Sequence, residues 1–207
     1  MKKAYDNRLV AGRGRHLYDK ILVAALRRQC PYCEYGMVST LDHFLPKSAF
    51  GALALEPWNL VPACKDCNHS LGAGSADDAS TELIHPFVWA DQETWLAASI
   101  MDGDEAVAEY RVEKPLAWSD ETFSRVQSHF SRLKLKTRYA EISAGAIHEI
   151  THSLQHLRAV GQPEVIGVHL AELADAQRLA RGPNHWRTAL LAALAVDEWY
   201  WRSWIWN

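Results

Sequence analysis

The C-terminal half of the chain carries apolar residues at the spacing of amphipathic helices. After Ser119 they recur every three or four positions and share one helix face: Phe123, Val126, Phe130 and Leu133. Ser119 itself, followed by acidic residues, is a typical helix N-cap. Longer periodic runs predict helices over residues 136–160 and 164–181, each ended by a glycine with a proline close behind. A fourth helix is expected from residue 184 to the end.

The N-terminal half has shorter apolar runs between turn-forming residues, which predict small elements. These are a helix over 18–28, strands over 41–45 and 59–63, a helix over 67–72, a helical turn over 93–98, and a hairpin with strands at 100–101 and 106–112 around the sequence DGDE. The pattern predicts an α+β fold that is mainly helical. Its expected parts are a basic arm and helix (1–29), a cysteine-bracketed segment (30–75), a connecting segment with the hairpin (76–117) and a helical region (118–207).

The composition is that of an ordinary globular chain, with 207 residues, 48% hydrophobic and 23% charged. No apolar run approaches the roughly 18 residues that a membrane-spanning helix needs. The N-terminus is basic but lacks the apolar core of a signal peptide. We therefore expect a cytoplasmic protein with no membrane partner, in which closely paired cysteines bind metal more often than they form disulfides.

The charge is unevenly distributed along the chain, although the net charge of −3 gives no general affinity for nucleic acid. Only Asp6 and Asp19 are acidic before the first cysteine. The basic residues there are Lys2, Lys3, Arg8, Arg13, Arg15, Lys20, Arg27 and Arg28. Such an arm could hold phosphates beside a functional site, and a solvated surface without a partner is the alternative.

All four cysteines lie in two C-x-x-C pairs, Cys30 with Cys33 and Cys64 with Cys67. Two such pairs, about thirty residues apart, suit a tetrahedral Zn²⁺ ion. Four thiolates leave no open coordination position, so this zinc would be structural, and its binding would be coupled to the folding of the segment. A disulfide or an iron–sulfur cluster is the alternative.

The residues between and after the cysteine pairs carry a family resemblance. They read L-D-H-x-x-P-K-S at 41–48, then W-N-L at 58–60, then C-x-x-C-N ending at Asn68. Together with the first C-x-x-C, this order resembles the HNH endonucleases and their zinc-stapled ββα-metal finger. The resemblance covers residues 30–68, less than a fifth of the chain, and implies that the segment 30–75 is such a finger.

The resemblance also implies roles for individual residues. His43 would be the general base, and Asp42 and Asn68 would bind a catalytic divalent metal, Mg²⁺ or Mn²⁺. Asn59 would fix the loop and the orientation of His43, and Lys47 is placed to contact a phosphate. The chemistry fits these roles, because a neutral imidazole can take a proton from water and oxygen ligands suit Mg²⁺.

The chain departs from the HNH pattern directly after Asn68. Many members carry a lysine a few residues later, whereas here the sequence continues His69-Ser70-Leu71-Gly72. His69 is also an alternative ligand for the catalytic metal. The implied function is hydrolysis of phosphodiester bonds in DNA. The residue pattern over 41–68 most resembles HNH nucleases of prokaryotic antiphage defence such as the Septu type, which work beside an ATPase. A mobile-element or toxin nuclease fits nearly as well.

Two other functions are compatible with the sequence. A catalytically inactive zinc-finger module would bind nucleic acid without cleaving it. In addition, His148-Glu149-x-x-His152 matches the H-E-x-x-H motif of zinc metalloproteases, for which His156 or Glu172 would have to supply a third ligand. A histidine-rich helix face without metal is the simpler interpretation of that motif.

The C-terminal sequence DEWYWRSWIWN places large side chains around every side of one predicted helix: Trp199, Tyr200, Trp201, Trp204, Ile205 and Trp206. The hairpin could bury them within the same chain. Alternatively, they would form the interface with a protein partner such as a defence ATPase, or with a second copy of the chain, because aromatic residues dominate such contacts.

Overall fold

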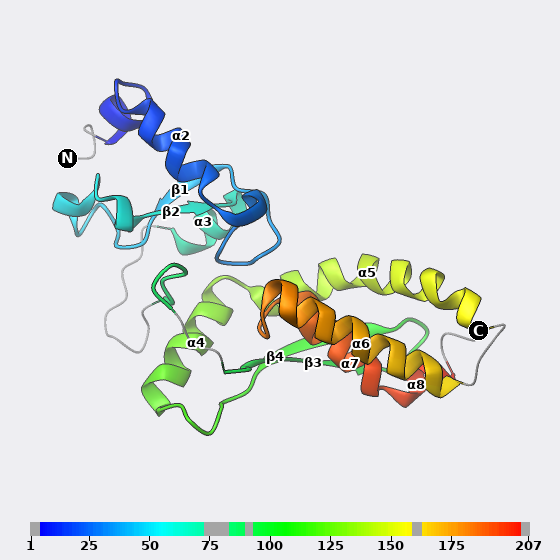
Figure 1. The fold of residues 1–207 in the computed structure, drawn as a ribbon. Coiled ribbons are helices and arrows are strands. Elements are labelled where there is room, and N and C mark those ends of the chain that lie inside the picture. The colour runs from blue at the N-terminus through cyan, green and yellow to red at the C-terminus, as the bar shows by residue number, and fades with distance from the viewer. Residues whose placement is uncertain (1–4, 73–82, 90–92, 159–162, 204–207) are drawn as a thin grey trace. The chain divides into compact units, whose positions relative to one another are not determined.

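The computed structural model describes residues 5–72, 83–89, 93–158 and 163–203. The chain is mixed α/β and mainly helical, and its strands form two separate antiparallel pairs, which agrees with the predicted α+β class (Figure 1). It divides into two compact units. Unit 1 contains Met1–Ala90 and Ser119–Leu133, and unit 2 contains Asp91–Trp118 and Lys134–Asn207. None of the helices in the described ranges combines the length and apolar character that a membrane crossing requires.

Unit 1 is built around the hairpin of β1 (Thr40–His43) and β2 (Leu60–Ala63), both of which the sequence predicts. The register pairs Thr40 with Ala63 and His43 with Leu60. The short helix α3 (Lys65–Leu71) follows β2 directly and packs against β1 (Figure 1).

An N-terminal layer packs on this hairpin. It consists of a helical segment, η1 (Tyr5–Val10), and helix α2 (Arg15–Val23), which contacts both strands. Five buried residues join the layer to the strands in one apolar cluster: Tyr5, Leu9, Tyr18, Leu41 and Leu60. Burial of these side chains fixes the N-terminal segment to the hairpin.

Helix α4 (Asp120–Arg132) belongs to unit 1, although it follows the second hairpin in the sequence. The Ser119 hydroxyl accepts a hydrogen bond from the Thr122 backbone N–H at 3.1 Å, which confirms the predicted N-cap. Val126, His129 and Phe130 are buried on one face of the helix.

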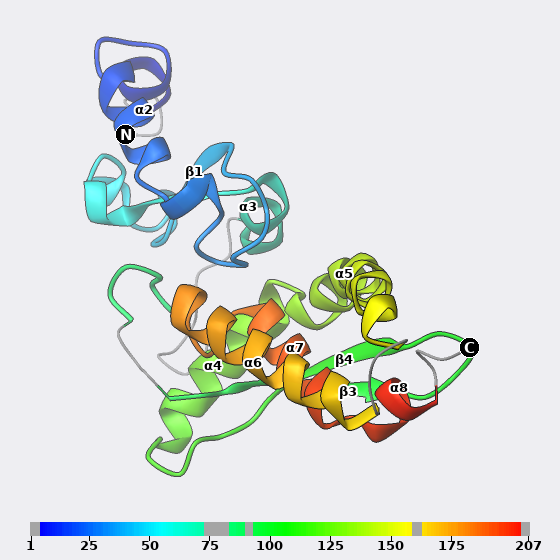
Figure 2. The same cartoon turned by 45° about the vertical axis from the view of Figure 1, so that its right-hand side comes forward.

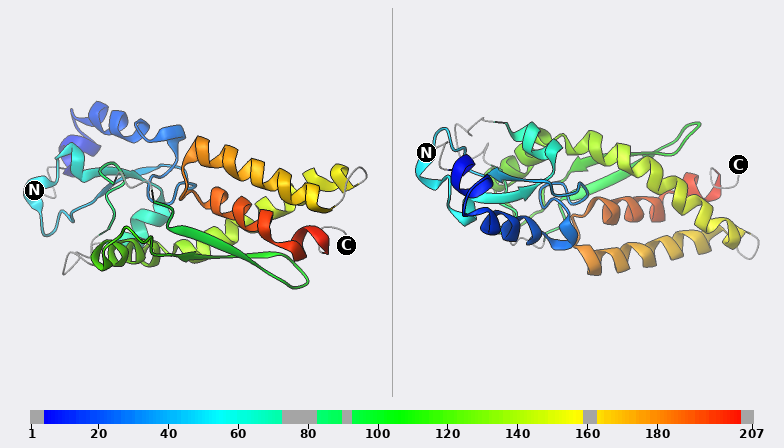
Figure 3. Two further views of the ribbon diagram at one scale, coloured as in Figure 1. Left: turned by 60° about the horizontal axis from the view of Figure 1, so that its bottom comes forward. Right: turned by 90° about the horizontal axis from the view of Figure 1, so that it is seen from above.

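Unit 2 is built around the hairpin of β3 (Leu96–Met101) and β4 (Val107–Val112). Helix α5 (Leu135–Arg158) packs against β4, and α7 (Trp186–Val196) packs against β3 (Figure 2). Helix α6 (Pro163–Arg181) runs beside α7, as both views of Figure 3 show.

The predicted helical turn over 93–98 is wrong, because β3 begins at Leu96. The alanines at 97 and 98 favour a helix locally, but tertiary contacts decide the outcome. Leu96 and Ile100 are buried in the strand. The side-chain oxygen of Asn184 accepts hydrogen bonds from the backbone N–H groups of Trp95 and Leu96, at 2.8 and 3.1 Å, and holds the start of β3.

The predicted helix over 18–28 is shifted toward the N-terminus. Helix α2 ends at Val23, and a separate turn (Leu26–Arg28) follows, in which Arg27 and Arg28 have positive φ angles of 54° and 58°. The Arg28 carbonyl accepts a hydrogen bond from the Val38 N–H at 2.9 Å. This contact bends the chain into the cysteine-bracketed segment, a tertiary constraint that the local pattern does not contain.

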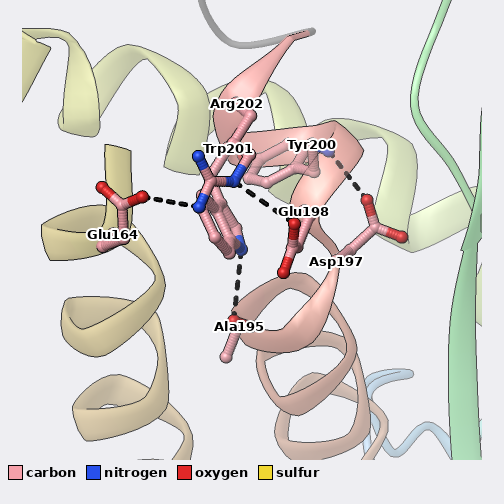
Figure 4. Close-up of polar contacts among 7 residues, drawn as sticks. All are labelled: Glu164, Ala195, Asp197, Glu198, Tyr200, Trp201 and Arg202. Atoms are coloured by element: carbon pink, nitrogen blue, oxygen red, sulfur yellow. Dashed lines mark hydrogen bonds and ion pairs between the residues drawn. The ribbon is translucent and has the colours of Figure 1, made fainter. Parts of the chain in front are cut away.

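The predicted single helix from residue 184 to the end is two helices, α7 and α8 (Glu198–Arg202). Asp197 separates them with an extended backbone and caps α8, since its carboxylate accepts the Tyr200 N–H at 2.8 Å (Figure 4). An aspartate that can cap a new helix N-terminus competes with helix continuation.

The C-terminal aromatic residues that the structure describes are largely packed within unit 2. Tyr200 and Trp201 are buried. The Trp201 indole donates to the Ala195 carbonyl at 3.2 Å, and a Cβ added at Gly167 of α6 would lie 3.3 Å from the Trp201 ring (Figure 4). Trp204, Ile205 and Trp206 lie outside the described residues. The hypothesis of an aromatic interface with a protein partner depends mainly on these three residues.

Candidate functional site

The four cysteines come together in unit 1 as the sequence predicts. All four are buried, and their sulfur atoms lie within 4.8 Å of one another. The Sγ atoms of Cys33 and Cys64 are 3.9 Å apart, close to the spacing of about 3.8 Å between ligands of a tetrahedral zinc with Zn–S bonds of about 2.3 Å. None of the four cysteines forms a disulfide. The cluster therefore fits a metal such as zinc.

Backbone groups support the sulfur atoms. The N–H of Gly36 donates to Cys33 Sγ and the N–H of Cys67 donates to Cys64 Sγ, each at 3.4 Å. A Cβ at residue 36 would lie 2.9 Å from Cys64 Sγ, so only glycine fits there without displacement. Hydrogen bonds from the neighbouring thiols, that of Cys30 first, lower the pKa of Cys64. This setting favours the thiolate form at Cys64, whereas hydrogen bonds within the same cluster, that of Cys30 first, raise the pKa of Cys33 and Cys67.

Asp42 lies in β1 as a buried carboxylate, 7% exposed. Its Oδ2 accepts a hydrogen bond from the Tyr32 hydroxyl at 3.1 Å. Burial raises the pKa of Asp42 to about 6, although this bond and one from the His43 backbone N–H oppose the rise. Among the residues that the structure describes, no cationic side chain pairs with Asp42, so its charged form lacks compensation.

His43, the next residue, is half-buried and held by a defined hydrogen bond. Its Nε2 lies 3.1 Å from the Ala54 carbonyl, which can only accept, so Nε2 carries the proton and donates. In the neutral ring, Nδ1 then has its lone pair available. The Tyr5 ring packs edge-on against the imidazole with centroids 4.5 Å apart. Burial, and then the nearby charge of Lys47, lower the pKa of His43 from its ordinary 6.5.

Asn59 holds the loop that joins β1 to β2. Its side-chain oxygen accepts the Leu45 N–H at 2.6 Å, and its amide donates to the Leu45 and Leu53 carbonyls, each at 3.1 Å. Asn59 is buried, so these bonds are shielded from water. The loop fixed in this way contains Ala54, whose carbonyl orients His43.

Asn68 and His69 lie in α3, which packs against β1. Asn68 is half-buried, between the buried residues Cys67 and Leu71, whereas His69 is exposed. Burial therefore favours Asn68 as the side chain that faces the strand. The carboxylate of Asp42 and the amide oxygen of Asn68 are hard oxygen donors of the kind that Mg²⁺ or Mn²⁺ prefers.

Lys47 extends from the same loop toward the N-terminal layer. Its ammonium lies 4.6 Å from the centroid of the Tyr5 ring and 3.9 Å from the Asp6 carboxylate, and the lysine side chain is only 26% exposed. Tyr5 thus contacts both His43 and Lys47. The N-terminal layer is part of the surroundings of the candidate site.

The H-E-x-x-H motif lies in α5, as expected, but is exposed. His148 and His152 stack edge-on with ring centroids 4.4 Å apart, and Glu149 is exposed beside them. Within the described ranges, the four cysteines are the only group of three or more metal-ligand side chains gathered at one point. Glu172 is exposed in α6, and the His156 side chain lies outside the described residues.

Three contacts of the site carry no signal in the local sequence pattern: those of Tyr5 with His43, of Tyr32 with Asp42, and of Gly36 with the cysteine cluster. Tyr32 stands inside the first C-x-x-C pair, a position that alone could have drawn attention to it. Tyr5 could not have been found in this way, because it reaches the site only through the packing of the N-terminal layer.

Comparison with known proteins gives one relative and no family. The chain is 29% identical over 226 residues to protein ea31 of Escherichia phage lambda, an alignment that covers 98% of this chain and 74% of ea31. No protein-family model matches the chain, and no solved structure matches it.

Loss of one sulfur ligand should remove the metal. We predict that the wild-type protein contains one zinc ion per chain and that Cys64→Ala loses it, with a fall in melting temperature of about 10 °C or more. Gly36→Ala should weaken zinc retention, because the added methyl would overlap Cys64 Sγ. Elemental analysis and thermal unfolding measure both effects. Lys65→Ala, at an exposed position of α3, is the control, and full zinc content in Cys64→Ala would contradict the assignment.

Proposed function

We propose that unit 1 contains an HNH-type ββα-metal finger and that the protein is an endonuclease that hydrolyses phosphodiester bonds in DNA. The observation that carries this proposal is the state of His43. Its Nε2–H donates a hydrogen bond to the Ala54 carbonyl, so the Nδ1 lone pair is available. Its lowered pKa keeps the ring neutral at cellular pH. A half-buried imidazole in this state is suited to act as a general base.

The order of the elements supports the same proposal. β1 presents Asp42 and His43, β2 returns the chain to the second cysteine pair, and α3 carries Asn68. A structural zinc in the cysteine cluster would hold the ends of this ββα arrangement together, so that catalytic residues on a very short hairpin keep a fixed geometry.

His43 would accept a proton from water on Nδ1. The water oxygen then forms a new bond to phosphorus, and the bond from phosphorus to the 3′ oxygen breaks. This leaves a 5′-phosphate and a 3′ oxygen that takes a proton from solvent water. Asp42 and Asn68 would hold Mg²⁺ or Mn²⁺, and this ion, when bound, offsets negative charge on the phosphate and the leaving oxygen. When substrate binds, Lys47 would leave its ion pair with Asp6 and contact a neighbouring phosphate.

The N-terminal layer supplies further positive charge for a polyanionic substrate. Asp6 and Asp19 are its acidic residues, and both take part in ion pairs, with Lys47 and Arg15. The exposed cations of the layer and of the turn that follows are Arg8, Arg13, Arg15, Lys20, Arg27 and Arg28. This surface could replace the phosphate contact of the lysine that is missing after Asn68.

Two biological settings are compatible with this chemistry. One candidate is antiphage defence with a protein partner such as an ATPase, and the other is a nuclease of a mobile element. The 29% identity with protein ea31 of phage lambda fits the mobile-element setting. A binding module without catalysis is the competing function, and it predicts nucleic-acid affinity without cleavage in any divalent metal.

Replacement of the proposed base tests catalysis. We expect wild-type protein to nick plasmid DNA in Mg²⁺ or Mn²⁺, and His43→Ala to nick it at least about 100-fold more slowly, because general-base catalysis is worth that much or more. The variant should keep its zinc and its melting temperature. His16→Ala, an exposed histidine of α2, is the matched control. Undiminished nicking by His43→Ala would contradict the mechanism.

The choice between the two candidate ligands of α3 gives a second test. Asn68→Ala should raise the Mg²⁺ concentration needed for half-maximal nicking about 10-fold or more, because a metal ligand is lost. His69→Ala should leave this concentration unchanged within about threefold, since His69 is exposed. The opposite pattern would make His69 the ligand.

The pH dependence of nicking follows from the two pKa shifts. His43 must be neutral, and its pKa lies below 6.5, while Asp42 must be charged, and its pKa is raised to about 6. Both requirements fail as the pH falls, so the rate should be constant near pH 7 and decline below about pH 6. More Mg²⁺ should move the decline to lower pH, because metal competes with the proton for Asp42. A rate that rises on acidification would contradict both assignments.

A further inference from the structure

Helix α4 reaches the first cysteine pair through a buried histidine. His129 is 6% exposed, and its Nε2 donates a hydrogen bond to the Tyr32 carbonyl at 3.2 Å. Burial lowers the pKa of His129 to about 4, so the ring is neutral at cellular pH and has a single N–H. That N–H goes to Tyr32, while Nδ1 has no hydrogen-bond partner among the described residues.

Tyr32, which His129 holds, is in turn hydrogen-bonded to Asp42. The Tyr32 side chain is 2% exposed, and its hydroxyl donates to Asp42 Oδ2 at 3.1 Å. A tyrosine hydroxyl is protonated at cellular pH, so it acts as the donor in this bond. The bonds from the Tyr32 hydroxyl and the His43 N–H occupy two of the roughly four acceptor sites of this carboxylate. The remaining sites are available to a cation.

We propose that Tyr32 is a positioning residue for the Asp42 carboxylate, and that His129 of α4 positions Tyr32 in turn. The inference rests on the proposed function, in which Asp42 binds the catalytic cation. It assigns α4, which lies far from the finger in the sequence, a role in the metal affinity of the site. Bonds of this kind hold a ligand in the orientation that the metal requires.

A purely structural role explains these contacts less well. If the Tyr32 hydroxyl only needed a buried acceptor, a neutral side chain would serve without the desolvation of a carboxylate. Asp42 is instead a buried acid with two hydrogen-bond donors and no cationic partner in the described part of the chain. His129, too, leaves one ring nitrogen unsatisfied while it holds the Tyr32 carbonyl. The buried carboxylate and the unsatisfied ring nitrogen are both unfavourable, and both are explained if Asp42 must bind a cation in a fixed orientation.

Tyr32→Phe tests the proposal, because it removes the hydroxyl and keeps the ring. Calorimetric titration with Mn²⁺ alone, on zinc-loaded protein without DNA, should show binding about 10- to 100-fold weaker than in wild type, the usual loss for a supporting residue of a metal site. The Mg²⁺ concentration for half-maximal nicking should rise in parallel. Zinc content should not change. His129→Leu should weaken Mn²⁺ binding in the same direction, by a smaller factor.

Tyr110→Phe is the matched control. It removes a buried hydroxyl in unit 2, which lies 2.6 Å from Ser143 Oγ and donates to the Trp186 carbonyl at 3.1 Å. This variant should lower the melting temperature and leave Mn²⁺ affinity unchanged. Wild-type Mn²⁺ affinity in Tyr32→Phe, or loss of its zinc, would overturn the positioning role alone. Wild-type protein that neither binds Mn²⁺ nor nicks DNA would overturn the proposed function and this inference with it.

Discussion

The close approach of four buried cysteines is the constraint on which unit 1 depends. β1 and β2 have four residues each, and a two-stranded hairpin of this size is marginal in water without further support. The cysteine pairs lie before β1 and after β2, so a metal held by all four closes the segment around the hairpin. Cys64 is also the N-cap of α3, because its Sγ accepts the Cys67 N–H. A metal bound there would couple strand pairing to the start of the helix.

The candidate hydrolytic residues lie on this small framework but depend on layers outside it. His43 is oriented by Ala54 through a loop that Asn59 fixes, and it packs against Tyr5 of the N-terminal layer. Asp42 is held by Tyr32, which α4 contacts. A four-residue hairpin with one short helix cannot bury enough surface to fix such side chains alone. Segments from both sides of it in the sequence therefore complete the unit.

Much of this arrangement could be predicted from the sequence, because many of its features are set by local interactions. The cysteine spacing, the two short strands, the second hairpin and the Ser119 cap each depend on residues close in sequence. The errors fall where distant contacts decide. Asn184 holds the start of β3, which local composition assigns to a helix, and the path of residues 26–28 is set by pairing with Val38. The contact of His129 with Tyr32 has no sequence signature, because 97 positions separate the two residues.

Under the proposed function, unit 1 would hold two metals with separate tasks, a closed structural zinc and an open catalytic cation. The most direct test is anomalous diffraction from crystals grown with zinc and soaked in Mn²⁺, with data collected at both absorption edges. We predict a zinc peak among the four sulfur atoms and a separate manganese peak beside the carboxylate of Asp42. Manganese within the cysteine cluster, or no ordered manganese near Asp42, would contradict it.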